Sequence, residues 1–260
     1  GYGTVKKGNL TNSVTSVKAD VLENRPVSSV ADALQGQVPG LSIVQSGRPG
    51  EASSMQLRGA TSLNSGGSPL LLVDGIPTDT ENFNYLNVED IESVSVLKDA
   101  ASAAVYGSRA ANGVILITTK RGAEGKAKVS FSTSAGVNVR TKDLEFANSY
   151  QYASYYNMMK GNDGGVATFS DEQLETFRNH SNPLMYPDIN WIDYCMNKAA
   201  FQSQHNVNIS GGTSNMKYFV SAGLFTQGGM FKQFTVTAAS TSDYTRYNHR
   251  ALLDLSVTTP

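Results

Sequence analysis

Residues 127–140 read Ala127-Lys128-Val129-Ser130-Phe131-Ser132-Thr133-Ser134-Ala135-Gly136-Val137-Asn138-Val139-Arg140. Apolar and polar side chains alternate along this stretch with a period of two over about thirteen residues, which is the pattern of an extended strand. Because successive side chains of a strand point to opposite faces, one face of this strand is apolar and the other is hydrated. This pattern decides the fold class of the second half of the chain.

Three further strands are predicted after it, at residues 204–210, 217–226 and 246–257. In the last of them Tyr247, Ala251, Leu253, Leu255 and Val257 alternate with Arg246, Asn248, Arg250, Asp254 and Ser256. The connections are about sixty residues, a tight turn at residues 211–215, and about twenty residues, and this alternation of long and short is typical of transmembrane β-barrels. The second half is therefore predicted to be antiparallel β-strands of a barrel.

Four strands cannot close a barrel, and an open sheet edge in lipid would leave backbone hydrogen-bonding groups unsatisfied. We therefore expect the barrel to be incomplete here and further strands to follow Pro260 in the natural polypeptide. Periodicity alone leaves a second interpretation open, because alternating strands with long insertions also occur in soluble sandwiches. The two interpretations differ in whether Val129, Phe131, Val137, Leu253 and Leu255 face outward or meet a second layer.

The first long connection contains two predicted helices. Tyr152, Tyr155, Tyr156 and Met159 have helical spacing, and Ser170-x-x-Gln173 has the form of a capping box. We expect the aromatic side chains to pack against neighbours in the same connection.

The N-terminal region, residues 11–119, alternates short strands with short capped helices, which indicates a compact α+β unit. One helix is predicted to start at Ser29 and to end at Gly36, and another to start at Asp99 and to end at Gly107. The predicted strands are 41–45, 54–58, 70–73, 91–97 and 113–119, of which the last is apolar on both faces and is expected at the centre of its sheet. The charged, glycine-containing segment 121–126 predicts a boundary between domains at 1–122 and 123–260.

The composition excludes several classes of function. Lys and Arg number 21 and Asp and Glu 22, giving a net charge of −1, so the chain lacks the broad basic surface that binds nucleic acid. Charged residues make up only 17% of the sequence. No apolar run reaches the roughly 18 residues of a membrane-spanning helix.

Motifs for catalysis and metal binding are not found. The glycines at 1–3 and 107–113 lack the remaining residues of nucleotide-binding loops, and His180, His205 and His249 are widely separated. Residues 163–165 lack the further ligands of a calcium loop. Cys195 is expected to be a small packed side chain. No catalytic residue and no metal site is predicted.

Four ordered motifs occupy the N-terminal region. They are Ser54-Met55-Gln56-Leu57-Arg58-Gly59, then Pro69-Leu70-Leu71-Leu72-Val73-Asp74-Gly75-Ile76-Pro77, then Ile91-Glu92-Ser93-Val94-Ser95-Val96-Leu97-Lys98-Asp99-Ala100, and then Tyr106-Gly107-Ser108-Arg109-Ala110-Ala111-Asn112-Gly113-Val114-Ile115-Leu116-Ile117-Thr118-Thr119-Lys120-Arg121-Gly122. Together they closely resemble the plug domain of TonB-dependent outer-membrane transporters. The segments 98–100 and 107–113 are similar to the SusC/RagA branch, which imports glycans or peptides.

This resemblance implies an α+β plug domain, with a short mixed sheet and short helices, at residues 1–122, followed by the first four strands of the barrel. The polar but weakly charged composition fits a plug that contacts a polar lumen. The implied function is import of oligosaccharides or peptides through the outer membrane of a Gram-negative bacterium. The implied partners are the inner-membrane TonB complex, a SusD-like surface lipoprotein, the ligand and outer-membrane lipid, with no cofactor and no enzymatic step. A soluble extracytoplasmic ligand-binding module is the alternative.

Two sets of residues are candidate functional sites. Related plugs hold cations at the positions of Arg58 and Lys98, which implies a lock against barrel carboxylates, although the family usually has Arg-Gly at Lys98-Asp99. Ligand contacts are expected in the loops 60–68 and 78–87, where amide and aromatic side chains suit sugars or peptide backbones. These ligand-contact candidates are Asn64, Asn82, Phe83, Asn84 and Tyr85.

Overall fold

The computed structural model describes residues 14–23, 27–45, 47–57, 59, 67–98, 104–232 and 243–256. The chain divides into two compact units. The first unit comprises Gly1–Val137, Phe201–Gly228 and Asp243–Pro260, and the second comprises Asn138–Ala200 and Gly229–Ser242. The predicted boundary near residue 122 falls inside the first unit and stays a prediction.

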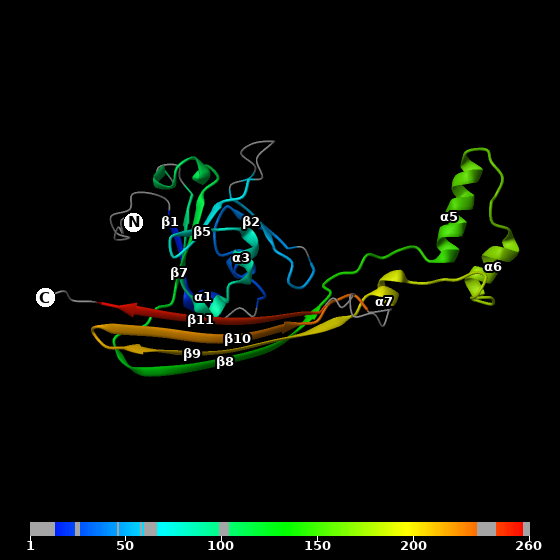
Figure 1. Cartoon of the computed structure of the whole chain (residues 1–260). Helices are drawn as coiled ribbons and strands as arrows, with labels where there is room; N and C mark the ends of the chain where they lie inside the picture. The colour runs from blue at the N-terminus through cyan, green and yellow to red at the C-terminus, as the bar shows by residue number, and fades with distance from the viewer. Residues whose placement is uncertain are drawn as a thin grey trace. The chain divides into compact units, whose positions relative to one another are not determined.

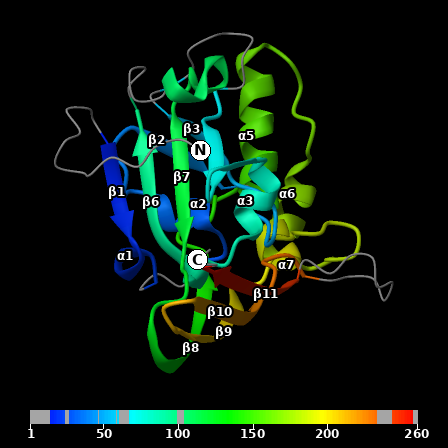
Figure 2. The same ribbon diagram turned by 60° about the vertical axis from the view of Figure 1, so that its left-hand side comes forward.

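The N-terminal region is built on a five-stranded sheet with the order β1-β6-β7-β4-β5. Its strands are β1 (Val14–Lys18), β4 (Leu70–Val73), β5 (Ile76–Thr78), β6 (Ile91–Leu97) and β7 (Val114–Thr119). β4 and β7 pair in parallel, and the other pairs are antiparallel. Figure 2 shows β1, β6 and β7 side by side. The prediction that β7 is central is confirmed, and its residues Val114, Ile115 and Ile117 are buried, so both faces of the strand carry buried apolar side chains.

Short helices and a two-stranded hairpin complete the hydrophobic core of this region. The helices are α1 (Ala19–Glu23), α2 (Val30–Leu34), α3 (Thr80–Tyr85), η2 (Val88–Asp90), η3 (Ala104–Tyr106) and η4 (Ser108–Ala110), and the hairpin pairs β2 (Leu41–Val44) with β3 (Ser54–Leu57). The Ser29 side chain accepts a hydrogen bond from the Asp32 backbone N–H and so caps α2 as predicted. Gly36 follows α2 with a φ of 76°, a conformation that glycine adopts without strain. All five residues of α2 are buried.

The structure differs from the sequence prediction at residues 78–87. Residues 78–87 were expected to form a loop, but the structure has α3 there because the Asp79 carboxylate accepts hydrogen bonds from the Asn82 backbone and side-chain amides. That loop prediction was wrong. For the helix predicted after Asp99, residues 99–103 lie outside the described part, and residues 104–106 form η3.

The second half supplies a sheet of four long antiparallel strands, which we call the long-strand sheet (Figure 1). It consists of β8 (Gly125–Val139), β9 (Ala199–Gly212), β10 (Met216–Gln227) and β11 (Tyr244–Leu255), in the spatial order β11-β10-β9-β8. All four predicted strands are present, and β8, β9 and β10 are longer than predicted. β9 and β10 are joined by the tight turn predicted at residues 211–215. The sheet is open, with β8 and β11 as its outer strands.

The second unit contains α5 (Ser149–Asn162), α6 (Asp171–Asn179) and α7 (Trp191–Cys195). Complete capping boxes begin α5 at Asn148 and α6 at Ser170. Aromatic rings form a continuous row of edge and stacked contacts with centroid distances of 5.3–6.2 Å, through Tyr152, Tyr156, Phe169, Phe177 and Tyr186. The expectation that these rings pack within their own connection is confirmed for Tyr152 and Tyr156. None of the helices in the described ranges has both the length and the apolar composition needed to cross a membrane.

Candidate functional site: the polar face of the long-strand sheet

The long-strand sheet has a polarity opposite to that of a soluble sheet. Its buried side chains are mostly polar, and its exposed side chains are mostly apolar. The buried polar set is Gln202, Gln204, Asn206, Ser221 and Arg246. The exposed apolar set includes Val129, Phe131, Val137, Phe201, Ile209, Val220, Tyr247, Leu253 and Leu255.

The five side chains that separate the barrel from the sandwich interpretation are all exposed. Val129, Phe131, Val137, Leu253 and Leu255 have exposed fractions between 58% and 69%. In a sandwich these side chains would contact a second layer and lose most of their exposed area. Their outward orientation was predicted for the barrel, and it is confirmed.

The polar face of β11 contacts the N-terminal region at three successive inward positions. Arg246 donates from Nη1 to the carbonyl oxygens of Ser28, at 2.7 Å, and Asn84, at 3.3 Å. Asn248 donates from Nδ2 to the Tyr85 carbonyl oxygen at 2.9 Å. Two of these carbonyls, at Asn84 and Tyr85, belong to the last turn of α3, where unpaired carbonyls attract positive charge. We call Arg246, Asn248 and Arg250 the β11 ladder.

Arg250, the third member of the β11 ladder, joins a polar cluster at the ends of β4 and β7. It donates to the Lys120 carbonyl oxygen at 3.0 Å and to the Thr119 hydroxyl, and Nη2 lies 3.7 Å from Asp74 Oδ2. Asp74 in turn accepts hydrogen bonds from the Thr119 backbone N–H, at 3.0 Å, and from its hydroxyl. The cluster therefore ties one strand of the long-strand sheet to two strands of the N-terminal sheet.

A third contact joins β9 and β10 to the start of η2. The Asn87 side-chain amide donates to Asn206 Oδ1 at 2.8 Å, and both residues are buried. Gly223 makes this contact possible, because a Cβ at that position would lie 2.6 Å from Asn206 Oδ1 and 2.8 Å from Asn87 Nδ2. A side chain at residue 223 would therefore push the pair apart.

Asp90, in η2, is a buried acid at the same boundary. Burial raises the pKa of its carboxyl above the ordinary value of 3.8, while the neighbouring Ser221 hydroxyl and the positive charges of Arg250 and Lys120 act in the opposite direction. Because desolvation is the largest effect, the folded protein favours the neutral form of Asp90 more than the unfolded chain does.

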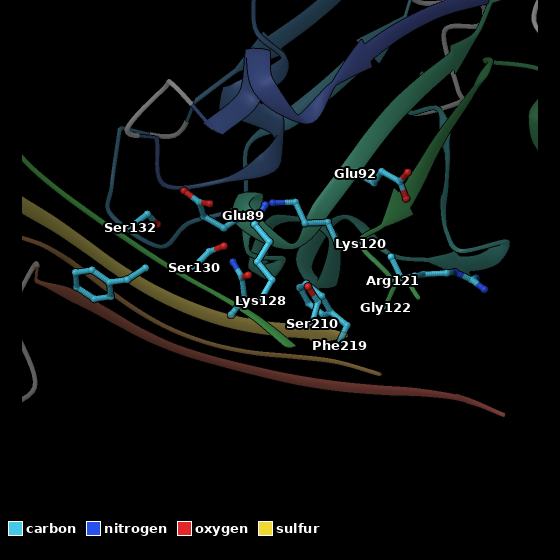
Figure 3. A pocket seen from close by; sticks show the side chains of 13 residues that line it. Glu89, Glu92, Lys120, Arg121, Gly122, Lys128, Ser130, Ser132, Ser210 and Phe219 are labelled. Atoms are coloured by element: carbon cyan, nitrogen blue, oxygen red, sulfur yellow. The ribbon is translucent and has the colours of Figure 1, made fainter. Parts of the chain in front are cut away.

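A polar pocket of about 660 Å³ lies beside these contacts (Figure 3). It is lined from the N-terminal region by Glu89, Glu92, Lys120, Arg121, Gly122 and Ala123, and from the long-strand sheet by Lys128, Ser130, Phe131, Ser132, Asn208, Ser210 and Phe219. Lys120 points toward Glu89, and Arg121 points away from both. The lining offers hydroxyl, amide and charged groups of both signs, so it suits water and polar solutes better than an apolar ligand.

The structure locates part of the predicted lock. Lys98 is half-buried at the end of β6 and forms no ion pair among the residues that the structure describes. Arg58 lies outside the described residues. The lock formed by Arg58 and Lys98 therefore stays a prediction.

The predicted ligand-contact residues of α3 fall into an exposed and a buried pair. Asn82 is exposed, and Tyr85 keeps 46% of its surface. Phe83 is completely buried in the hydrophobic core, and Asn84 is buried with its Nδ2 bonded to the Thr80 carbonyl oxygen. A ligand could reach Phe83 only if the core opened, so Phe83 is not a ligand contact in the folded protein. Asn64 lies outside the described residues.

Comparisons with known proteins connect these two sheets to one family. The sequence model of the TonB-dependent Receptor Plug Domain matches residues 6–114. TonB-dependent receptor P26 of Formosa agariphila is 35% identical over 98% of this chain, and TonB-dependent receptor SusC of Bacteroides thetaiotaomicron is 34% identical over 91%. The RagAB peptide importer in its open-open state superimposes with a TM-score of 0.78 and 27% identity over the whole chain.

The chain belongs to the TonB-dependent receptors. Its N-terminal region is the receptor's plug domain, and the long-strand sheet is the start of the barrel. The chain spans 24% and 23% of the lengths of the receptors P26 and SusC, and 30% of the RagAB chain. The siderophore receptor PirA of Pseudomonas aeruginosa, at 18% identity and a TM-score of 0.53, shares the fold.

Sequence reasoning about this receptor chain did not identify the β11 ladder. The alternation of residues 246–256 placed Arg246, Asn248 and Arg250 on one polar face, but it did not indicate what they contact. The available signal was the pair Arg246 and Arg250, which lie on the same face with only one inward position between them. Two arginines so close together are unusual in a chain with only 17% charged residues. The partners of Arg246, Ser28 and Asn84, are 218 and 162 residues away, and those of Arg250, Lys120 and Thr119, are 130 and 131 residues away, so none of them leaves a trace in local periodicity.

Proposed function

We propose that this chain is the plug and barrel start of an outer-membrane importer for oligosaccharides or peptides. The observation that carries the proposal is the inverted polarity of the long-strand sheet, whose polar face holds the plug domain and whose apolar face is exposed. An apolar surface of this extent is stable in lipid and unstable in water. A soluble binding module, the alternative, would need another layer over Phe131, Leu253 and their neighbours.

The plug domain supplies the gate in this proposal. Its contacts with the sheet are mainly hydrogen bonds between polar groups, which water can replace when the plug moves. We propose that an inner-membrane TonB complex pulls on the N-terminal segment, and that a SusD-like lipoprotein covers the ligand at the cell surface. The similarity to SusC and to the RagAB peptide importer supports these partners and ligand classes. The solute crosses the membrane without a chemical reaction, so no catalytic residue or cofactor takes part.

Ligand recognition is assigned to the exposed side chains of α3. Tyr85 offers an aromatic face for the apolar face of a sugar ring or for a peptide side chain, and Asn82 offers amide hydrogen bonds. Replacing Tyr85 with Ala should weaken ligand binding, and replacing it with Phe should preserve stacking. Unchanged affinity in Tyr85→Ala would remove Tyr85 from the binding site.

Uptake by cells tests the function as a whole. The full-length receptor is expressed in a Gram-negative host that lacks its own importer, and uptake of labelled oligosaccharides and peptides is measured with and without a proton gradient. We expect uptake of one of the two ligand classes, and we expect it to stop when the gradient is dissipated.

Deletion of the plug domain provides the matched control. Without residues 6–114 the barrel should admit small polar solutes without an energy source. The proposal fails if the intact receptor takes up neither class of ligand, or if uptake continues unchanged after the gradient is removed.

A further inference from the structure

We infer that the β11 ladder is the anchor by which the barrel wall holds the plug domain in the closed position. This inference rests on the proposed function, since an anchor has a role only if the plug moves. The predicted lock places cations on the plug, at Arg58 and Lys98. Among the described residues the structure shows a separate set of contacts, with cations on the wall, at Arg246 and Arg250, and acceptors on the plug.

The three ladder side chains act together because the strand geometry aligns them. Positions 246, 248 and 250 lie on one face of β11, and each donates at least one hydrogen bond to the plug domain. Arg246 Nε also donates to Asn248 Oδ1 at 2.8 Å. Arg246 and Asn248 hold the end of α3, and Arg250 holds the ends of β4 and β7, so the plug is fixed at two separate places.

Each arginine is positioned by a phenylalanine of the neighbouring strand. The Arg246 guanidinium lies 5.3 Å from the ring centroid of Phe225, and that of Arg250 lies 5.5 Å from Phe219. Both rings are buried, with exposed fractions of 1% and 2%. A cation above an aromatic face is attracted by the ring, and the stack limits the rotamers of the arginine. The donors are therefore oriented before the plug docks against them.

Most of the acceptors are backbone carbonyls. Ser28, Asn84, Tyr85 and Lys120 all contribute their carbonyl oxygens. Substitution of those plug side chains leaves the acceptors in place, whereas substitution of the wall arginines removes the donors. We therefore expect substitutions of the wall arginines to change the rate of plug release, and substitutions of the side chains of Ser28 and Tyr85 to leave it unchanged.

Burial makes the hydrogen bonds between Arg246 and the plug domain strong enough to affect the rate of plug release. Arg246 is only 7% exposed, and its planar guanidinium uses two different nitrogens, because Nη1 donates to two backbone carbonyls and Nε donates to Asn248 Oδ1, an arrangement that a lysine cannot reproduce. Hydrogen bonds from a charged donor exceed those between neutral groups, so loss of one arginine should speed plug release about ten- to a hundredfold.

Pulling on the N-terminus of the full-length receptor tests the inference. The receptor is inserted in lipid bilayers, and atomic force microscopy records the rate at which the plug leaves at constant force. We expect faster release for Arg246→Ala and Arg250→Ala, an intermediate rate for the two Arg→Lys variants, and the largest increase for the double Ala variant. The Lys variants keep the charge and guard against loss of folding in the Ala variants.

Two matched controls accompany these variants. The first is His249→Ala, because His249 lies between Asn248 and Arg250 in the sequence but on the exposed face of β11. The second is Arg178→Ala, which removes an exposed arginine of α6. Both should release the plug at the unmodified rate. Equal rates in the unmodified receptor and all the Arg246 and Arg250 variants would overturn the anchor.

The uptake assay described above keeps the two conclusions separate. Faster plug release in the arginine variants, combined with no uptake by the unmodified receptor, would support the anchor and contradict the importer. Energy-dependent uptake combined with unchanged release would support the importer and contradict the anchor.

Discussion

Asp90 shows how a single residue at the boundary between plug and barrel can make stability depend on pH. Burial raises the pKa of its carboxyl in the folded protein, so the folded state retains a proton that the unfolded chain releases. The resulting stabilisation is fully present below the ordinary pKa of 3.8 and is lost as the pH rises through the folded value. Above that value the protein keeps a buried carboxylate, which is partly offset by Arg250, Lys120 and Ser221.

We predict that Asp90→Asn removes this pH dependence. The free energy of unfolding of the plug domain, measured by urea titration of the full-length receptor at several pH values, should fall with rising pH in the unmodified protein and fall less in the variant. The advantage of the variant should therefore grow with pH. Glu81→Gln, at an exposed position of α3, should retain the unmodified profile. Parallel profiles for the Asp90 variant and the unmodified protein would show that Asp90 does not control the dependence.

At the scale of elements, the stability of α2 depends on its N-cap and on its burial, because the helix is short. It has only five residues, too few for a helix to be stable alone, and all five are buried. Its Asp32 carboxylate also accepts hydrogen bonds from Ser28, at 2.8 Å, and Ser53, at 2.9 Å. We predict that Ser29→Ala destabilises the plug domain by about 1 kcal/mol. Urea titration measures the change, and Ser42→Ala, at an exposed strand position, should shift the midpoint little.

The aromatic row of the second unit provides a separate prediction for α5 and α6. Phe177 has two ring neighbours, Phe169 at 6.2 Å and Tyr186 at 5.3 Å. Phe177→Leu keeps an apolar side chain of similar size but loses both ring contacts, each worth about 0.5–1.5 kcal/mol. Limited proteolysis should therefore cleave the connection between α5 and α6 faster in this variant. Tyr155→Leu, which changes an exposed ring outside the row, is the comparison, and equal cleavage of the two variants would contradict the prediction.

Elements with a strict local pattern could be predicted from the sequence, and elements that depend on distant contacts could not. The alternation of residues 127–139 identified β8 almost to its ends, and Ser29 and Ser170 marked the starts of α2 and α6. The helix α3 was missed because its sequence, Thr80–Tyr85, lacks apolar periodicity and is fixed by the Asp79 cap and by buried Phe83. The candidate site was only partly predictable, since hydrogen bonds such as that from Arg246 to Ser28 join residues 218 positions apart.

At the scale of the whole molecule, the low charge content of the chain has a structural explanation. Polar side chains of the long-strand sheet are buried against the plug domain, where amides and hydroxyls can be satisfied at lower cost than ionised groups. Asn206, which accepts a hydrogen bond from the Asn87 side-chain amide, follows this rule, and Arg246 is the charged exception because its Nη1 donates to two backbone carbonyls of the plug domain. The same composition therefore serves a sheet that is polar inside and apolar outside.

This inverted polarity predicts a sharp difference between neighbouring positions of β8. Phe131 is 69% exposed on the apolar face, whereas Ser134 lies half-buried on the polar face. A lysine on the lipid face of a membrane barrel costs about 2–4 kcal/mol near the middle of the bilayer, and a lysine on the inner face remains hydrated. We predict that Phe131→Lys lowers the stability of the full-length receptor in lipid vesicles by this amount and that Ser134→Lys has a much smaller effect. The free energy of unfolding, obtained by urea titration of the receptor in the vesicles, measures both changes. Equal effects of the two substitutions would mean that the apolar face does not contact lipid, and a soluble sandwich would then be the better account of these strands.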